Sequence, residues 1–173
     1  MLFKLTGSVI VILSCTFLGF VLSNDCKRRP QQLRELQSLL QMFENQITYL
    51  SDVISEAFER ISRVGCSETC IFFSKTVEIL KKERAISASE AWELAVRQNI
   101  KKTSLNMEDE EIIAAFGRML GSSDLEGQVK NIRLTLEHLK LQEEKAEESR
   151  RSNEKMYRSL GILGGIAVVI VLL

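Results

Sequence analysis

The sequence predicts an all-α fold, in which a soluble, antiparallel bundle of about six helices lies between two apolar terminal segments. Charged residues make up 27% of the chain, yet none lies between Leu5 and Val21 or between Ser159 and Leu173. In the rest of the chain, apolar residues recur at spacings of three and four, as on one face of a helix. The chain has a single proline, Pro30, and so few chain breakers disfavour a turn-rich β fold.

Charge and length restrict the classes of protein that the chain can belong to. Its 173 residues include 23 basic and 23 acidic ones, so no overall charge suggests nucleic acid as a partner. Residues 24–158 hold 22 of the basic and all 23 of the acidic residues, a net charge of −1, and can bury one modest core. We expect an N-terminal transmembrane anchor over 1–23, a helical domain over 24–141, a charged stalk over 142–158 and a second anchor over 159–173.

The first apolar run, Leu5 to Leu22, has 18 uncharged residues, and a helix of that length is about 27 Å long. A cleaved signal peptide is the alternative, because Lys4 supplies a charged start and Val21-Leu22-Ser23 resembles a cleavage site. The basic residues that follow the run favour a retained anchor and place the domain in the cytoplasm. These topology-setting residues are Lys27, Arg28 and Arg29.

The last apolar run, Leu160 to Leu173, has 14 residues, which is short for a full membrane span. A strand in the core is the alternative, but so apolar a terminus would leave a large exposed patch on a soluble protein. The basic residues before this run again place the domain on the cytoplasmic side. They are Arg150, Arg151, Lys155 and Arg158.

Apolar spacing and capping residues predict six helices in the domain. The first begins near Pro30, and its expected buried face is Leu33, Leu36, Leu40, Phe43, Ile47 and Leu50. The second is capped by Ser51 and Asp52, carries Val53, Ile54, Ala57, Phe58 and Ile61, and stops at Gly65. The third starts at Ser67 and contains Ile71, Phe72, Val77 and Leu80.

The last three helices have clearer start signals. Ser87 and Glu90 have capping-box spacing for a fourth helix, with Trp92, Ala95 and Val96 facing inward. Asn106 and the acids 108–111 suit the start of a fifth, which buries Ile112, Ile113, Phe116 and Leu120 and ends at Gly121. Ser123 and Glu126 form a second capping box, and a heptad-like stripe follows at Leu125, Val129, Ile132, Leu136 and Leu139. No chain breaker interrupts 128–160, so we expect this helix to continue into the second anchor.

The residues that could carry chemistry favour structural roles. Cys66 and Cys70 would share a helix face, but metal binding would need two more ligands, with Cys26 and His138 the only soft candidates. The spacing also lacks the Cys-x-x-Cys pattern of redox pairs, so buried structural thiols in a reduced, intracellular domain are the better interpretation. His138 is expected on a helix surface. We predict no cofactor, no metal site and no catalytic residue.

Trp92 and Tyr49 are the large aromatic residues with a polar tip that lie within the domain. Either could anchor a partner, because such residues dominate the energetics of protein interfaces. Core packing is the favoured interpretation for Trp92, whereas for Tyr49 the sequence favours neither role.

Several short motifs resemble the stage III sporulation protein AB family, over nearly the whole chain. They are Arg29-Pro30, the Leu33/Leu36/Leu40 helix, Gln46-Ile47-Thr48-Tyr49, Ala91-Trp92, Phe116-Gly117, Leu120-Gly121 with Asp124, and Asn153-Glu154-Lys155-Met156 running into Ser159-Leu160-Gly161. Each motif alone is weak, but their order between two terminal anchors is specific. Family members often carry glycine and proline shortly after the tyrosine, whereas Leu50-Ser51-Asp52 follows here.

The resemblance implies a structural role rather than an enzymatic one. It implies a multi-pass protein of the cell membrane, with its domain facing the mother-cell cytoplasm, in a channel complex that joins mother cell and forespore. The domain is similar to the inner-membrane platform protein of type II secretion machines, so the implied partners are other channel subunits and a motor ATPase. The rival hypothesis is an extracytoplasmic helical binding or sensor protein with a cleaved signal peptide and a tail anchor.

Overall fold

The computed structural model describes residues 27–49, 54–64, 68–83, 85–121 and 124–172. These ranges contain six α-helices, a short 3-10 helix η1 and no strand, which confirms the predicted all-α fold. The helices are α2 (Arg28–Tyr49), α3 (Ile54–Val64), α4 (Cys70–Lys82), α5 (Ala88–Asn99), η1 (Ile100–Lys102), α6 (Met107–Arg118) and α7 (Leu125–Leu172).

The chain divides into two compact units, one formed by Arg29–Glu144 and the other by Met1–Arg28 with Lys145–Leu173. Helix α7 passes through both as one continuous helix, which confirms the expectation that the last helix runs unbroken into the terminal apolar segment. No helix of the described residues, which leave out 1–26, is both long and apolar enough to cross a membrane. The expected anchor over 1–23 lies outside the described residues.

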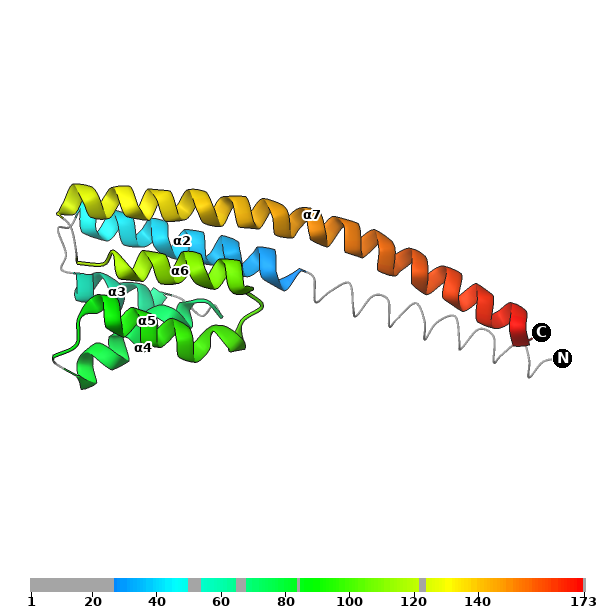
Figure 1. The fold of residues 1–173 in the computed structure, drawn as a ribbon, viewed down its shortest axis with the longest axis horizontal. Coiled ribbons are helices and arrows are strands. Elements are labelled where there is room, and N and C mark those ends of the chain that lie inside the picture. The colour runs from blue at the N-terminus through cyan, green and yellow to red at the C-terminus, as the bar shows by residue number, and fades with distance from the viewer. Residues whose placement is uncertain (1–26, 50–53, 65–67, 84, 122–123, 173) are drawn as a thin grey trace. The chain divides into compact units, whose positions relative to one another are not determined.

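Within Arg29–Glu144 the helices stack in three layers, with α2 and α6 between α7 and the group α3, α4 and α5 (Figure 1). Helices α2 and α7 are antiparallel, because Arg29 bonds to Gln142 whereas Glu44, further along α2, pairs with Arg133. The predicted antiparallel arrangement is therefore observed for this pair.

Local capping explains where α5 and α6 begin. The Ser87 hydroxyl accepts a hydrogen bond from the Glu90 N–H, and the Glu90 carboxylate accepts one from the Ser87 N–H, so the predicted capping box is confirmed. Asn106 caps α6 in the same reciprocal way, with Asp109 as its partner. A cap of this kind contributes about 1 kcal/mol to stability. Beyond α6, Gly121 has φ of 72°, a left-handed conformation that favours glycine, as expected.

Helix α7 begins one residue later than predicted, with Asp124 rather than Ser123 before its first residue. Because the helix begins at Leu125, its N-cap is Asp124, whose Oδ1 accepts from the Gly127 N–H at 3.0 Å. Ser123 lies outside the described residues, as do the predicted cap residues Ser51 and Asp52, the predicted stop Gly65 and the predicted start Ser67.

Aromatic rings from five helices form the centre of the core. Phe43 of α2 stacks on Phe58 of α3, with ring centroids 4.8 Å apart, and Phe58 stacks on Trp92 of α5 at 5.4 Å. Phe73 of α4 and Phe116 of α6 meet the Trp92 ring edge to face at 4.9 and 5.2 Å. Each such pair adds about 0.5–1.5 kcal/mol beyond its buried area, so this cluster joins α2 through α6.

The predicted buried faces hold for α2 and α5, and α4 contains the four apolar residues predicted for the third helix. Most of the predicted α2 face is buried, with Leu50 outside the described residues, and in α5 Trp92, Ala95 and Val96 are buried. In α4 the buried side chains are Cys70, Phe72, Phe73 and Thr76, whereas the predicted Ile71, Val77 and Leu80 are only partly buried. The Thr76 hydroxyl donates to the Phe72 carbonyl at 2.7 Å, and this hydrogen bond allows the polar side chain to be buried. A pattern of apolar residues cannot predict the burial of Thr76, because threonine is polar.

Helix α7 packs through a mixed polar and apolar seam rather than the predicted apolar stripe. Ile132 and Leu139 are buried as expected, but Val129 and Leu136 are only partly buried and Leu125 is exposed. Ala146 is buried as well, and the other buried positions are polar: Gln128, Thr135 and Gln142, seven residues apart. Each makes a hydrogen bond, to Met119 O, Asn131 O and Glu108 Oε2 respectively. The heptad spacing was therefore correct, but half of the buried seam carries polar side chains.

Candidate functional site

A partly buried polar network joins three helices where the unit Arg29–Glu144 begins and ends. The Arg29 guanidinium forms a forked ion pair with Asp109, from Nε to Oδ2 at 2.8 Å and from Nη2 to Oδ1 at 2.9 Å. The same Nη2 donates to Gln142 Oε1 at 3.1 Å, and Gln142 Nε2 donates to Glu108 Oε2 at 2.9 Å. We call Arg29, Glu108, Asp109 and Gln142 the entry network, because the chain enters the unit at Arg29 and leaves it just after Gln142.

Burial makes the entry network sensitive to change. The Asp109 side chain is fully buried and that of Arg29 is 22% exposed. Removing one partner would strand a desolvated charge, and the forked geometry is specific to arginine. Sequence reasoning treated Arg29 only as a topology-setting residue and missed this network, because 80 positions separate Arg29 from Asp109. The Arg29-Pro30 motif was the one available signal.

A close contact between α5 and α6 joins the Trp92 ring to Gly117. A Cβ atom placed on Gly117 would lie 2.2 Å from Trp92 Cδ1, so only glycine fits at this position. The indole Nε1 donates to the Ile113 carbonyl at 2.9 Å, which satisfies the polar tip of a fully buried ring. Trp92 therefore packs in the core, the interpretation that the sequence favoured, and offers no surface of its own to a partner.

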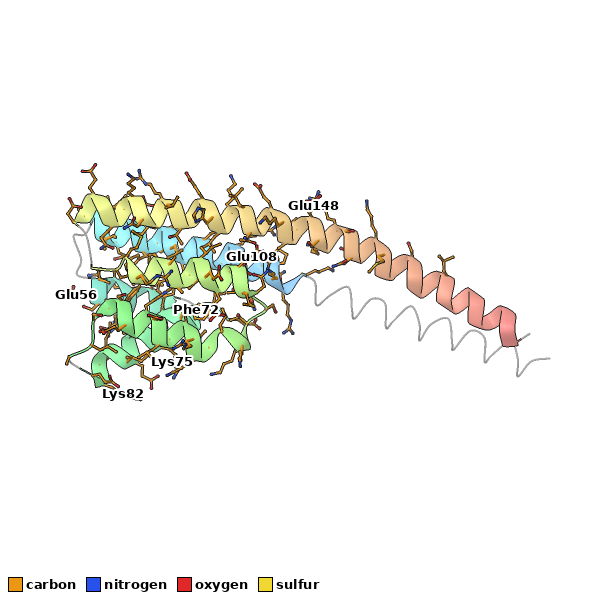
Figure 2. All side chains as sticks on the ribbon, in the orientation of Figure 1. Glu56, Phe72, Lys75, Lys82, Glu108 and Glu148 are labelled. Atoms are coloured by element: carbon orange, nitrogen blue, oxygen red, sulfur yellow. The ribbon has the colours of Figure 1, made fainter. Side chains whose placement is uncertain are left out.

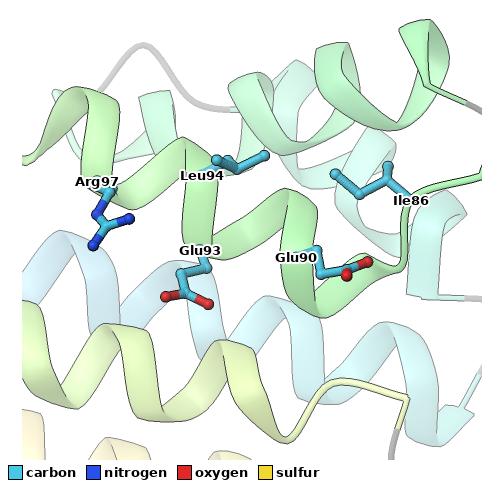
Figure 3. Close-up of a pocket in the computed structure, with 5 residues that line it drawn as sticks. All are labelled: Ile86, Glu90, Glu93, Leu94 and Arg97. Atoms are coloured by element: carbon cyan, nitrogen blue, oxygen red, sulfur yellow. The ribbon is translucent and has the colours of Figure 1, made fainter.

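The outer face of α5 carries the candidate contact surface of the domain. A shallow hollow of about 320 Å³ is lined by Ile86, Glu90, Glu93, Leu94 and Arg97. All five come from α5 or the segment just before it (Figure 3). Within the described part of the chain, Glu93 and Arg97 make no ion pair or hydrogen bond through their side chains, and Leu94 is 37% exposed. We call these five residues the α5 surface.

Two glutamates outside the α5 surface, Glu59 and Glu78, pair with neighbouring cations. Hydrogen bonds from Lys75 and Lys82 lower the pKa of Glu78 to about 2. Lys81 and, to a lesser extent, Arg63 lower the pKa of Glu59 in the same way. Within the α5 surface, the Ser87 backbone and hydroxyl lower the pKa of Glu90, so its carboxylate is already engaged at the helix start. Glu93 and Arg97 thus remain the charged groups of this surface that are available to a partner.

The other predicted site residues fall in both units. Tyr49 is the last residue of α2, and its side chain lies outside the described part, so its role stays a prediction. Arg150 and Arg151 pair with Glu147 at 3.0 and 3.5 Å. The topology-setting residues Arg28 and Lys155 are exposed and Lys27 is half-buried, while the Arg158 side chain is outside the described part.

The remaining candidates behave as structural or surface residues. Cys70 is buried and its thiol donates to the Ile61 carbonyl at 3.8 Å, as the structural interpretation expects, whereas Cys66 lies outside the described residues. His138 is exposed on α7, as predicted. Among the residues that the structure describes, no group of three or more His, Cys, Asp or Glu side chains could hold a metal ion.

Comparison with known proteins identifies the family. A model of the family described as stage III sporulation protein AB matches residues 4–173. The chain belongs to the stage III sporulation protein AB family. It is 33% identical over 170 residues to the stage III sporulation protein AB of Bacillus subtilis (strain 168), with 98% of this chain and 99% of the relative covered. A solved structure of stage III sporulation protein AB (SpoIIIAB) has a TM-score of 0.67 and 31% identity, and covers 72% of this chain and 98% of that one.

Membership of this family confirms the resemblance that the sequence motifs indicated. The structure shows where several of those motifs lie and what they contact. Arg29-Pro30 opens α2 and supplies the guanidinium of the entry network. Ala91-Trp92 and Phe116-Gly117 meet in the contact between α5 and α6. Gly121 provides the left-handed residue of the turn that follows α6. These motifs therefore lie where helices meet rather than around a reactive group.

Proposed function

We propose that this member of the stage III sporulation protein AB family is a non-catalytic platform subunit of a sporulation channel complex. In this proposal the complex joins mother cell and forespore, and the helical domain docks a motor ATPase from the mother-cell cytoplasm. The observation that carries the proposal is the family match from residue 4 to residue 173, which includes both apolar terminal runs as well as the domain.

The arrangement of the domain supports a scaffold role. Its inner polar groups satisfy one another in the entry network, and its aromatic core joins five helices. The α5 surface leaves Leu94, Glu93 and Arg97 available on the outside. Such a unit is suited to holding other proteins in place, with the chemistry supplied by those partners.

Membrane anchoring is the second part of the proposal. We assign residues 1–23 and 159–173 as the two anchors, because both are free of charge and both adjoin basic residues on the domain side. Lys27, Arg28 and Arg29 flank the first run, and Arg150, Arg151, Lys155 and Arg158 precede the second. The positive-inside rule then places the domain in the cytoplasm.

Accessibility of a cysteine at position 82 tests this topology. Lys82 is 70% exposed at the end of α4, where Figure 2 shows it on the outer edge of the domain. In Lys82→Cys, with the native cysteines replaced, we expect a membrane-impermeant maleimide to label the protein only after the cells are lysed. Labelling in intact cells would instead support the extracytoplasmic binding or sensor protein and contradict a platform that meets a cytoplasmic ATPase.

Replacement of Cys70 by serine tests the absence of thiol chemistry. A serine hydroxyl is too short to span the 3.8 Å from the sulfur position to the Ile61 carbonyl, so burying it should lower the free energy of unfolding by about 1–3 kcal/mol. Because the proposed platform needs no thiol chemistry, we still expect spore counts within about twofold of wild type, whereas deletion of the whole chain should block development after engulfment. Cys66→Ser should be equally tolerated. Protein levels measured by immunoblot provide the control. A normal level of Cys70→Ser protein together with a loss of spores would indicate a redox or metal role.

A further inference from the structure

Helix α7 has an open face on the side that points away from the rest of the unit Arg29–Glu144. In this unit α7 is the outermost of the three layers, with α2 and α6 on one side of it (Figure 1). Its polar contacts with other helices go to these two: Arg133 binds Glu44 of α2, and Gln142 binds Arg29 of α2 and Glu108 of α6. The opposite face of α7 is therefore uncovered in the part of the chain that the structure describes.

Two leucines on this open face are much more exposed than the leucines that lie between them. Leu134 is 49% and Leu141 56% exposed, whereas Leu136 is half-buried and Leu139 is fully buried. Seven residues make nearly two turns of an α-helix, so Leu134 and Leu141 lie one above the other on the same side. A single exposed leucine is ordinary on a protein surface, but two at heptad spacing are typical of a helix that pairs with another helix.

The two leucines have an acid on one side and a base on the other. Glu137 and His138 follow Leu134 by three and four residues, and these spacings place them on opposite sides of the line that joins the leucines. Both are exposed, and within the described residues neither side chain makes an ion pair or a hydrogen bond. We call Leu134, Glu137, His138 and Leu141 the outer stripe.

The outer stripe is complementary to itself when two copies meet with their α7 helices parallel. A twofold axis along the helices brings each leucine against its own equivalent and turns the acidic side of one stripe toward the basic side of the other. Glu137 then lies beside His138 of the second copy, twice by symmetry, and the imidazole can donate a hydrogen bond to the carboxylate in either charge state. Antiparallel helices would instead set Glu137 against Glu137 of the second copy, which is unfavourable.

We propose that a second copy of this chain binds along the outer stripe, giving a twofold-symmetric dimer with parallel α7 helices. Leu134 and Leu141 form the centre of the contact, and the two pairs of Glu137 with His138 determine the relative direction of the helices. A second copy is the occupant that supplies leucines at the same spacing and charges in the matching order. The inference goes beyond the proposed platform role and does not depend on it, because that role specifies neither the number of copies nor the surface through which they meet.

Cross-linking between single cysteines tests the dimer on the full chain in living cells. Leu134→Cys, Leu141→Cys and the control Lys140→Cys are made in a background in which serine replaces every native cysteine except the buried Cys70. Lys140 is a matched control, because it is exposed beside Leu141 on the same helix but turned about 100° away from it. With a short, membrane-permeant bismaleimide, we expect at least fivefold more cross-linked dimer at positions 134 and 141 than at 140. Equal yields at the three positions would overturn the inference, as would cross-links to another protein in place of the dimer.

Production of two differently tagged chains in one cell determines the direction of the helices. One chain carries Leu134→Cys and the other Leu141→Cys, so the three possible dimers differ in mass on a denaturing gel. In the parallel dimer equal positions face each other, and we expect at least threefold more cross-linking between chains with the same tag than between chains with different tags. A majority of cross-links between different tags would show antiparallel helices and contradict the proposed dimer.

Charge reversal tests the pairing of Glu137 with His138. In the Leu141→Cys background, Glu137→Lys alone and His138→Glu alone each place two groups of the same kind together, so each should lower the yield of dimer at least threefold. The two substitutions combined restore an acid opposite a base, and the yield should return to within about twofold of the parent. Immunoblots of the total chain correct for protein level. A double variant that dimerises no better than the single variants would contradict the pairing.

Discussion

Replacing Asp109 with asparagine is expected to lower the free energy of unfolding by about 3–5 kcal/mol, the usual cost of removing one partner from a buried ion pair. The Asp109 side chain is fully buried, and it accepts from Arg29 through both oxygens and from the Asn106 N–H through Oδ2. An amide turns one acceptor into a donor that faces the guanidinium, so the Arg29 charge loses its compensation. Thermal and urea unfolding of the detergent-solubilised chain, followed by circular dichroism, measures the change.

The pair of Arg34 and Glu143 provides the control for this prediction, because it also crosses between helices but lies at the surface. Burial raises the pKa of Glu143, but hydrogen bonds from Arg34 and Gln37 outweigh this and hold the pKa below its usual value. The Arg34 side chain is 52% exposed, so Glu143→Gln should cost no more than about 1 kcal/mol. If Asp109→Asn and Glu143→Gln lowered the free energy of unfolding by the same amount, the entry network would contribute no more to stability than a surface ion pair.

Replacing Gly117 with alanine is expected to lower the free energy of unfolding by about 2–3 kcal/mol, the upper range for overpacking a core. Gly117 is the next-to-last residue of α6, where alanine is still the better helix former by less than the about 1 kcal/mol of a helix interior, so propensity alone predicts a small gain. The added Cβ would lie 2.2 Å from Trp92 Cδ1, and the indole is held by neighbouring rings and by the Ile113 carbonyl. The steric conflict therefore outweighs the gain in helix propensity, so Gly117→Ala destabilises the domain.

Gly121→Ala and a smaller residue at position 92 serve as controls for the steric origin of the effect. At Gly121 the added Cβ has its nearest neighbour at 3.9 Å, so only the φ of 72° is unfavourable, at a cost of about 1–2 kcal/mol. In a Trp92→Leu background the penalty of Gly117→Ala should shrink. A penalty of the same size in both backgrounds would exclude the indole as its cause.

The entry network connects stability to the proposed role. It ties α2 and α7 to α6 at the point where the chain passes from one compact unit to the other. In the proposed platform, a force on the terminal segments would reach the domain through these two helices.

The sequence by itself determined the helical class, most of the helix boundaries and the family. These depend on signals within a few residues: apolar spacing along α2, the reciprocal caps at Ser87 and Asn106, and the left-handed position at Gly121. Such signals act locally, through backbone hydrogen bonds and the helical repeat, so they can be read from the chain before it folds.

Only the tertiary structure decided which residues meet. The pairing of Arg29 with Asp109, the approach of Gly117 to Trp92 and the polar half of the α7 seam all join distant positions or bury polar side chains. No local pattern encodes these features, because a polar residue is tolerated inside only when folding brings it a partner.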